Sequence, residues 1–96
     1  MSAFQVETSE TAATVRLDGE LTVEEARALQ FALRTALLRP RALTIDTAAL
    51  TRIDVAALQV LLAAARGAPI QFASAPAPAW TEALTRFGLA AAFASN

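Results

Sequence analysis

The chain has 96 residues, a hydrophobic fraction of 55% and a formal net charge of -1. The near-neutral charge argues against a nucleic-acid-binding protein, because a basic face is what neutralises phosphates. His, Cys, Lys and Tyr are all absent. Their absence excludes histidine-based triads, thiolate nucleophiles, Schiff-base lysines and metal sites with nitrogen or sulfur ligands. We therefore expect a protein that is not an enzyme and needs no cofactor.

The first residues lack the basic and apolar pattern of a secretory signal. No apolar run approaches the ~18 uninterrupted residues of a membrane span. The length suits one domain that buries somewhat over ~60% of the surface of its unfolded chain. The expectation is a single cytoplasmic domain over residues 1–96, without a membrane span.

Two strands joined by a polar turn are predicted at the start of the chain. Their apolar residues alternate with polar ones at the period of two typical of strands, and these are Phe4, Val6, Val15 and Leu17. Asp18 and Gly19 are expected to end the second strand.

The next predicted element is a helix that runs from Thr22 to about Leu38. Thr22 and Glu25 have the spacing of a capping box, in which each side chain satisfies a free backbone amide of the other residue. The face expected to meet the core carries Ala26, Leu29, Leu33 and Leu37. Phe31 and Leu38 fall on another side. We expect them to pack against a neighbouring element or, alternatively, to extend a contact surface.

A unit of strand, loop and helix is predicted at the centre of the chain. Leu43 and Ile45 alternate with polar residues, which indicates a buried strand. A loop from Thr47 to Arg52 is expected to follow this strand. The loop then leads into a helix that starts after Asp54.

Asp54 stands at the N-cap position of an apolar helix from Val55 to Arg66. Its carboxylate is expected to accept a hydrogen bond from the free backbone amide of Ala56 or Ala57. The face predicted to meet the core carries Leu58, Leu61, Leu62 and Ala65. The opposite face carries Ala56, Gln59, Val60 and Ala63, which are small and uncharged. Such a face indicates contact with another molecule, or it reflects the high alanine content of the chain.

The last part of the chain is predicted to form a short strand, a helix and a closing turn. The strand covers Ile70 to Ala73, and Pro78 suits the first turn of the helix because no hydrogen bond is lost there. The core face of this helix carries Trp80, Ala83, Leu84 and Phe87. Gly88 is predicted to be a left-handed C-cap, and Phe93 to close the core.

The predicted order is therefore strand, strand, helix, strand, helix, strand, helix, which is typical of an α/β domain. Helices between successive strands imply parallel neighbours and right-handed connections. Asp46 and Asp54 both border the predicted loop and are the one carboxylate pair expected to converge. Such a pair could bind Mg²⁺, but a turn and an N-cap account for both aspartates better. We predict no metal site.

The segment that enters the central helix resembles the STAS domain family, which includes bacterial anti-sigma factor antagonists and the tails of sulfate transporters. The family loop usually reads Asp-Ser-Ser-Gly-Leu or Asp-Ser-Thr-Gly-Leu, and a partner kinase phosphorylates its second hydroxyl residue. Here the segment reads Asp54-Val55-Ala56-Ala57-Leu58, so the phosphoacceptor position falls on Ala56. The resemblance implies a STAS-like α/β domain with a mixed sheet of four to five strands and helices packed on it.

The resemblance also implies a protein-interaction module of bacterial signalling, similar to an anti-sigma factor antagonist. Its partner would be an anti-sigma factor, a histidine-kinase-like protein or a signalling complex. The residues predicted to contact the partner come from the loop and the outer helix face, and they are Thr47, Thr51, Arg52, Asp54, Val55, Ala56, Gln59, Val60 and Ala63. No phosphorylation is expected at Ala56. A displaced switch would use Thr51 or Thr22, although the cap explains Thr22 more economically.

Two alternatives stay open at this point. One is an accessory STAS subunit of a chemotaxis or lipid-transport assembly. The other is a small-ligand or nucleotide-binding module that uses the helix start as an anion site. The carboxylate of Asp54 argues against the anion site, because it would already fill and neutralise that position.

Overall fold

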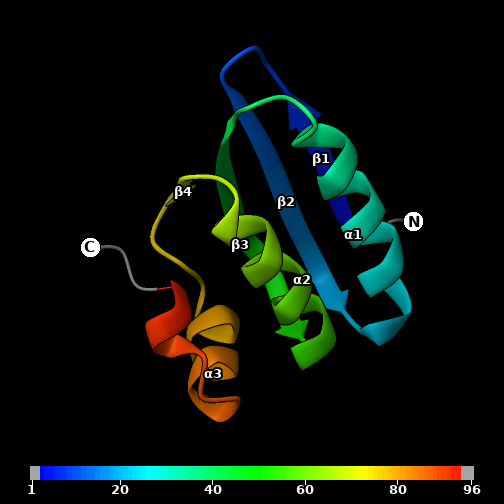
Figure 1. Cartoon of the computed structure of the whole chain (residues 1–96). Helices are drawn as coiled ribbons and strands as arrows, with labels where there is room; N and C mark the ends of the chain where they lie inside the picture. The colour runs from blue at the N-terminus through cyan, green and yellow to red at the C-terminus, as the bar shows by residue number, and fades with distance from the viewer. Residues whose placement is uncertain (1–2, 94–96) are drawn as a thin grey trace.

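The centre of the fold is a long strand, β3 (Ala42–Ile53), in a computed structural model that describes residues 3–93. It lies between β2 (Ala12–Leu21) and the short β4 (Ile70–Phe72), and β1 (Phe4–Thr8) completes a four-stranded sheet. β1 pairs with β2 antiparallel, whereas β2 and β4 both run parallel to β3. The predicted mixed sheet and the β-β-α-β-α-β-α order are confirmed (Figure 1).

The core-facing side of the sheet comes mainly from β2 and β3. Alternate residues of the two strands are fully buried, and they are Ala13, Val15, Leu17, Leu43 and Ile45. The register places Val15 beside Ile45 on one side and beside Val6 on the other. The period of two in the sequence therefore identified the buried side of the sheet correctly.

The segment from Thr47 to Arg52 is the second half of β3 and not the predicted loop. Burial alternates strictly up to Thr47 and then falls on every third residue, at Leu50 and Ile53. The pairing with β2 is irregular at the same level, with register shifts between Arg16 and Asp18 and again after Gly19. Such shifts turn side chains away from strict alternation, which is why the sequence pattern did not reveal the strand.

The same irregularity explains why β2 continues past its predicted end. Gly19 has a φ of 67° inside the strand, a left-handed conformation that favours glycine. The chain then resumes pairing, with Glu20 opposite Arg52 and Leu21 opposite Ile53. Both strands therefore reach the same end of the sheet, where the next two helices begin.

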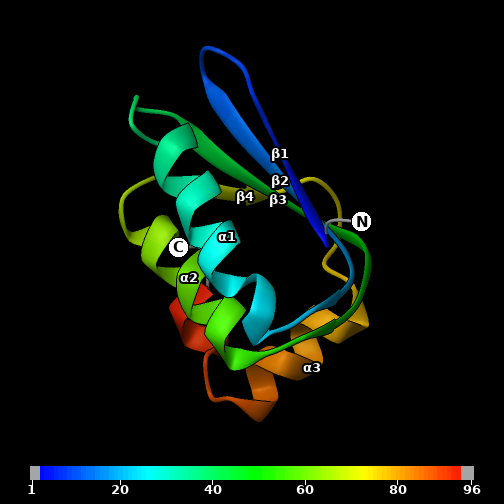
Figure 2. The same cartoon turned by 90° about the vertical axis from the view of Figure 1, so that its right-hand side faces the viewer.

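Two helices, α1 (Val23–Ala36) and α2 (Val55–Arg66), lie side by side over one face of the sheet (Figures 1 and 2). Their buried residues are Ala26, Leu29, Leu33 and Ala36 in α1, and Ala57, Leu58 and Leu61 in α2. The predicted core faces are confirmed in most positions. Leu37, Leu62 and Ala65 are half-buried rather than core residues.

α1 begins after Thr22, whose hydroxyl accepts a hydrogen bond from the Glu24 amide at 3.4 Å and donates one to the Glu25 carboxylate at 2.6 Å. The helix ends at Ala36, before the predicted end, and Arg41 donates a hydrogen bond to the Ala36 carbonyl. Thr22 is therefore the N-cap of α1, as predicted. The reciprocal bonds of the predicted capping box are replaced, because the Glu25 carboxylate accepts from the Thr22 hydroxyl and the Glu25 amide donates to the Thr22 carbonyl.

The prediction that Phe31 and Leu38 pack against a neighbouring element is wrong. Their exposed fractions are 73% and 81%. Phe31 lies away from the core face of α1, and Leu38 lies beyond the end of that helix. Within residues 3–93 no element covers either side chain. The alternative, in which they extend a contact surface, stays a prediction.

The last helix, α3 (Pro78–Arg86), packs against β3 near the end of the sheet, and a 3-10 turn, η1 (Ala90–Phe93), follows it (Figure 1). Trp80 is 1% exposed. Its ring meets Phe72 and Phe93 edge to face, with centroid distances of 5.5 and 5.2 Å. Each such aromatic pair adds about 0.5–1.5 kcal/mol beyond the area it buries. The predicted core role of Phe93 is confirmed.

The chain leaves α3 through the predicted glycine cap. Gly88 has a φ of 69°, and the amide of Leu89 donates to the carbonyl of Leu84 at 2.8 Å. This is the long hydrogen bond of a Schellman motif, which satisfies a carbonyl that the helix end leaves free.

Candidate protein-docking surface

Asp54 is the N-cap of α2, as predicted, but its carboxylate does not cap that helix. Its Oδ2 accepts a hydrogen bond from the backbone amide of Val23 at 3.3 Å, and its Oδ1 lies 3.8 Å from Nε of Arg52. Val23 is the first residue of α1. The predicted bond to Ala56 or Ala57 is therefore replaced by a bond to the neighbouring helix.

This geometry follows from the parallel pairing of β2 and β3. The amide of Asp54 donates to the carbonyl of Leu21, the last residue of β2, at 2.9 Å, so the pairing continues one residue beyond the end of β3. α1 and α2 consequently start next to each other. One carboxylate then faces the positive dipole ends of two helices, which is a favourable place for a negative charge.

The outer face of α2 lies largely as predicted. Gln59 and Ala63 are exposed, and Ala56 and Val60 are half-buried. Val55, at the start of the helix, is 38% exposed. No charged residue occurs in α2 before Arg66. The face is small, uncharged and partly apolar, which is unusual for a helix in contact with solvent alone.

Thr51 and Arg52 lie near the end of β3, and Arg52 reaches the N-cap of α2 through its ion pair with Asp54. Both strand residues are exposed, and they line a hollow of about 530 Å³ together with Glu20, Glu82 and Arg86. The hollow lies between β3 and α3, so it is separate from the outer face of α2.

Thr47 cannot belong to this surface, which corrects the prediction. Its side chain is 2% exposed, and its hydroxyl oxygen accepts a hydrogen bond from the amide of Ala77 at 2.9 Å. Ala77 is the N-cap of α3. Thr47 therefore anchors the start of α3 to the sheet.

Asp46 and Asp54 do not converge, which also corrects a prediction. They are separated by the second half of β3, and eight residues of strand span about 26 Å. Oδ1 of Asp46 accepts a hydrogen bond from the amide of Ala48 at 3.0 Å, and its Oδ2 lies 3.5 Å from Nε of Arg16. Within residues 3–93, no three His, Cys, Asp or Glu side chains group closely enough to hold a metal ion.

A family model described as "Mlab, STAS domain" matches residues 4–93 of this chain. The chain belongs to the STAS domain family. The match covers the sheet, α1, α2, α3 and η1, and so includes the start and outer face of α2. A search of curated proteins found no match.

Solved structures with the same fold include the anti-sigma factor antagonist SpoIIAA in its unphosphorylated form, with a TM-score of 0.72 and 19% sequence identity. That match covers 86% of this chain and 82% of SpoIIAA. A second match, to a crystal structure of Mglu, has a TM-score of 0.61 and 20% identity. It covers 75% of this chain but only 20% of that much longer protein. At these identities the structures establish the fold of this STAS domain.

In this STAS domain, the position where the family resemblance expects a phosphorylated hydroxyl is taken by Ala56. Its methyl group is half-buried at the start of α2, beside the two helix ends that Asp54 joins. Val55 and Ala57, on either side of it, also lack a hydroxyl. The nearest exposed hydroxyl toward the N-terminus is that of Thr51, on β3.

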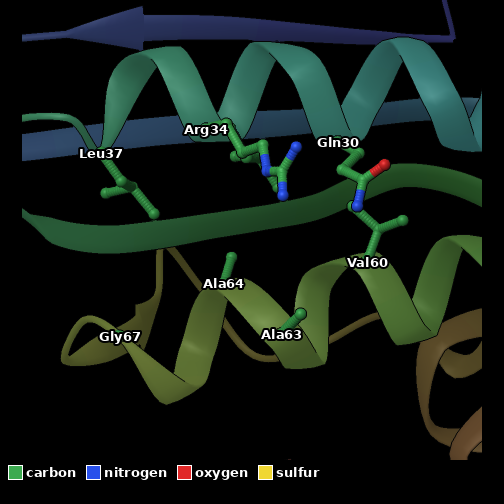
Figure 3. Close-up of a pocket in the computed structure, with 8 residues that line it drawn as sticks. Gln30, Arg34, Leu37, Val60, Ala63, Ala64 and Gly67 are labelled. Atoms are coloured by element: carbon green, nitrogen blue, oxygen red, sulfur yellow. The ribbon is translucent and has the colours of Figure 1, made fainter.

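The sequence analysis missed a groove between α1 and α2. One part of it has a volume of about 350 Å³ and is lined by residues such as Arg34, Leu37 and Ala64. Figure 3 shows Gln30 and Arg34 extending from α1 toward α2. The missed signal is the seven-residue spacing of Arg27 and Arg34, which places two positive side chains on the same side of α1. No helix within residues 3–93 is long and apolar enough to cross a membrane.

Proposed function

We propose that this STAS domain is a non-enzymatic protein-interaction module of bacterial signalling, of the anti-sigma factor antagonist type, that works in the cytoplasm. It docks a protein partner through the docking surface, which we define as Thr51, Arg52, Asp54, Val55, Ala56, Gln59, Val60 and Ala63. The observation that carries the proposal is the uncharged and partly apolar outer face of α2. Exposed faces of this kind favour protein contacts.

The proposed partner binding is permanent rather than switched. A phosphate at the start of α2 would add about -1.5 to -2 charges beside Asp54 and repel a partner. Ala56 has no hydroxyl to accept that phosphate. The domain therefore stays in a binding-competent state, unless Thr51 serves as a displaced site.

The accessory-subunit alternative uses the same surface and differs only in its partner, a component of a chemotaxis or lipid-transport assembly. The small-ligand alternative has less support. The amide of Val23 at the start of α1 is already bonded to the Asp54 carboxylate, so a negative charge occupies the position that an anion would take.

Site-specific photo-crosslinking in the native cell tests this proposal. A photoreactive amino acid at Gln59, which is exposed on α2, should capture one protein that mass spectrometry identifies. The matched control carries the same group at Glu10, which is exposed in the turn between β1 and β2. Capture from position 10 with none from position 59 would move the docking surface to the other end of the domain.

A further inference from the structure

The groove between α1 and α2 consists of two adjoining hollows along the helices. The two hollows, of about 350 and 400 Å³, share the lining residues Gln30, Val60 and Ala63. The groove runs from Val23 and Ala56 at the helix starts to Leu37 and Gly67 at the helix ends. The fourteen steps from Val23 to Leu37 correspond to about 21 Å of helix. This length matches a docked helix of about four turns.

The two sides of the groove differ in charge. The α1 side carries Arg27 and Arg34, whereas the α2 side contributes only small, apolar or amide side chains, such as Val60, Ala63 and Gln59. No Asp or Glu occurs among the lining residues of either hollow. Within residues 3–93, neither arginine forms an ion pair, because the salt bridges there involve Arg16 and Arg52. The groove is therefore uncharged and partly apolar on its α2 side and positive on its α1 side.

The two arginines have a helical spacing. They are seven residues apart, so they project from the same side of α1 at a separation of about 10.5 Å. Two carboxylates seven residues apart on a second helix have the same separation. A helix that is apolar on one face and acidic at this interval therefore matches both sides of the groove.

We infer that the α1–α2 groove binds an amphipathic helix of a protein partner, with acidic residues one heptad apart that pair with Arg27 and Arg34. This inference rests on the proposed function, because the groove includes Ala56, Gln59, Val60 and Ala63 of the docking surface. The inference adds to the proposed function the chemical character of the partner's binding segment. The apolar face of the helix packs on α2, and its carboxylates lie along α1.

Charge and shape favour this occupant over two others. A second copy of this chain docked through α1 would bring arginines against arginines, because an antiparallel pair centred near Phe31 places Arg27 of one copy beside Arg34 of the other. An anionic membrane is flat, whereas the two arginines border the hollows between the helices. A partner helix is convex and fills that groove.

Two synthetic peptides test the inference on the full chain. Each is an amphipathic helix with leucine on one face. One carries glutamate at two positions a heptad apart, and the matched peptide carries lysine there. NMR titration of the isotope-labelled protein should show shift changes at Gln30, Val60 and Ala63 with the glutamate peptide. Binding of the lysine peptide should be at least about tenfold weaker.

Charge reversal of the protein completes the test. The double variant Arg27→Glu/Arg34→Glu should no longer bind the glutamate peptide and should bind the lysine peptide. The control variant Arg86→Glu, on α3, should bind both peptides as the wild type does. If Arg27→Glu/Arg34→Glu does not fold, the neutral variant Arg27→Gln/Arg34→Gln replaces it in the test. This variant should bind the glutamate and lysine peptides equally well. Equal binding of both peptides by the wild type would overturn the inference, as would shift changes outside the groove.

Three further outcomes would also overturn it. Anionic phosphatidylglycerol vesicles that shift the groove resonances would make the site a membrane surface. Concentration-dependent self-association with the same shifts would make it a dimer interface. If the native partner binds the Arg27→Glu/Arg34→Glu variant normally but no longer binds the Ala56→Glu variant, the inference fails while the proposed function stands. If the partner binds Ala56→Glu as tightly as the wild type, the proposed function itself fails.

Discussion

The carboxylate of Asp54, the N-cap of α2, accepts a hydrogen bond from the backbone amide of Val23, the first residue of α1, at 3.3 Å. One side chain therefore joins the starts of the two helices that form the groove. The link depends on the parallel pairing of β2 and β3, which brings both helix starts to the same end of the sheet. The proposed docking surface and the groove meet at this point.

Asp54→Ala should lower the free energy of unfolding by about 1 kcal/mol, because a negative charge is lost beside two helix starts. The ion pair with Arg52 adds little, since the Arg52 side chain is 64% exposed. Urea denaturation followed by circular dichroism measures the change. Asp54→Asn is the control, since it keeps an acceptor oxygen and should lose less. A much larger loss for Asp54→Ala would indicate a buried network around this residue.

Thr47→Val should destabilise the protein by about 1–3 kcal/mol, because the half-buried amide of Ala77 loses its acceptor on the buried Thr47. Thr47→Ser keeps the hydroxyl and is the matched control. Denaturation of the two variants in parallel gives the difference. Neither change should alter partner affinity in a folded sample. A folded Thr47→Val protein that no longer binds its partner would return Thr47 to the docking surface.

Incubation with ATP and the purified partner should leave the mass of the protein unchanged. A kinase needs a hydroxyl at the start of α2, and Val55, Ala56 and Ala57 have none. Intact-mass spectrometry makes the measurement. A stoichiometric gain of one phosphate, mapped to Thr51 by fragmentation, would replace the permanent mode with a displaced switch. A gain at Thr22 would place the regulatory site at the cap of α1.

The sequence predicted those parts of the fold in which side-chain periodicity and local chemistry agree. The alternation around Val15 and Ile45 identified the buried strands, and Gly88 identified the end of α3. Each of these signals is local, because a period of two or a left-handed residue can be read from a few neighbours. The fold was therefore predictable to the level of element order and sheet type.

The predictions failed where pairing between distant segments decides the structure. The second half of β3 exists because β2 pairs with it through two register shifts, which disturb the alternation around Leu50. The bond of Asp54 to Val23 joins residues 31 positions apart, so no local capping pattern indicates it. The burial of Thr47 likewise depends on Ala77, in a different element. The outer face of α2 was predictable, whereas its groove with α1 needed the packing of two helices.

The central claim is that a protein partner docks on the start and outer face of α2. Calorimetric titration of the partner identified by crosslinking, with wild type, Ala56→Glu and Ala56→Ser, tests it most directly. Ala56→Glu adds a charge beside Asp54 and should weaken binding at least about tenfold, or ~1.4 kcal/mol, while circular dichroism stays native. Ala56→Ser should bind like the wild type. A natively folded Ala56→Glu protein that binds its partner with unchanged affinity would contradict the account.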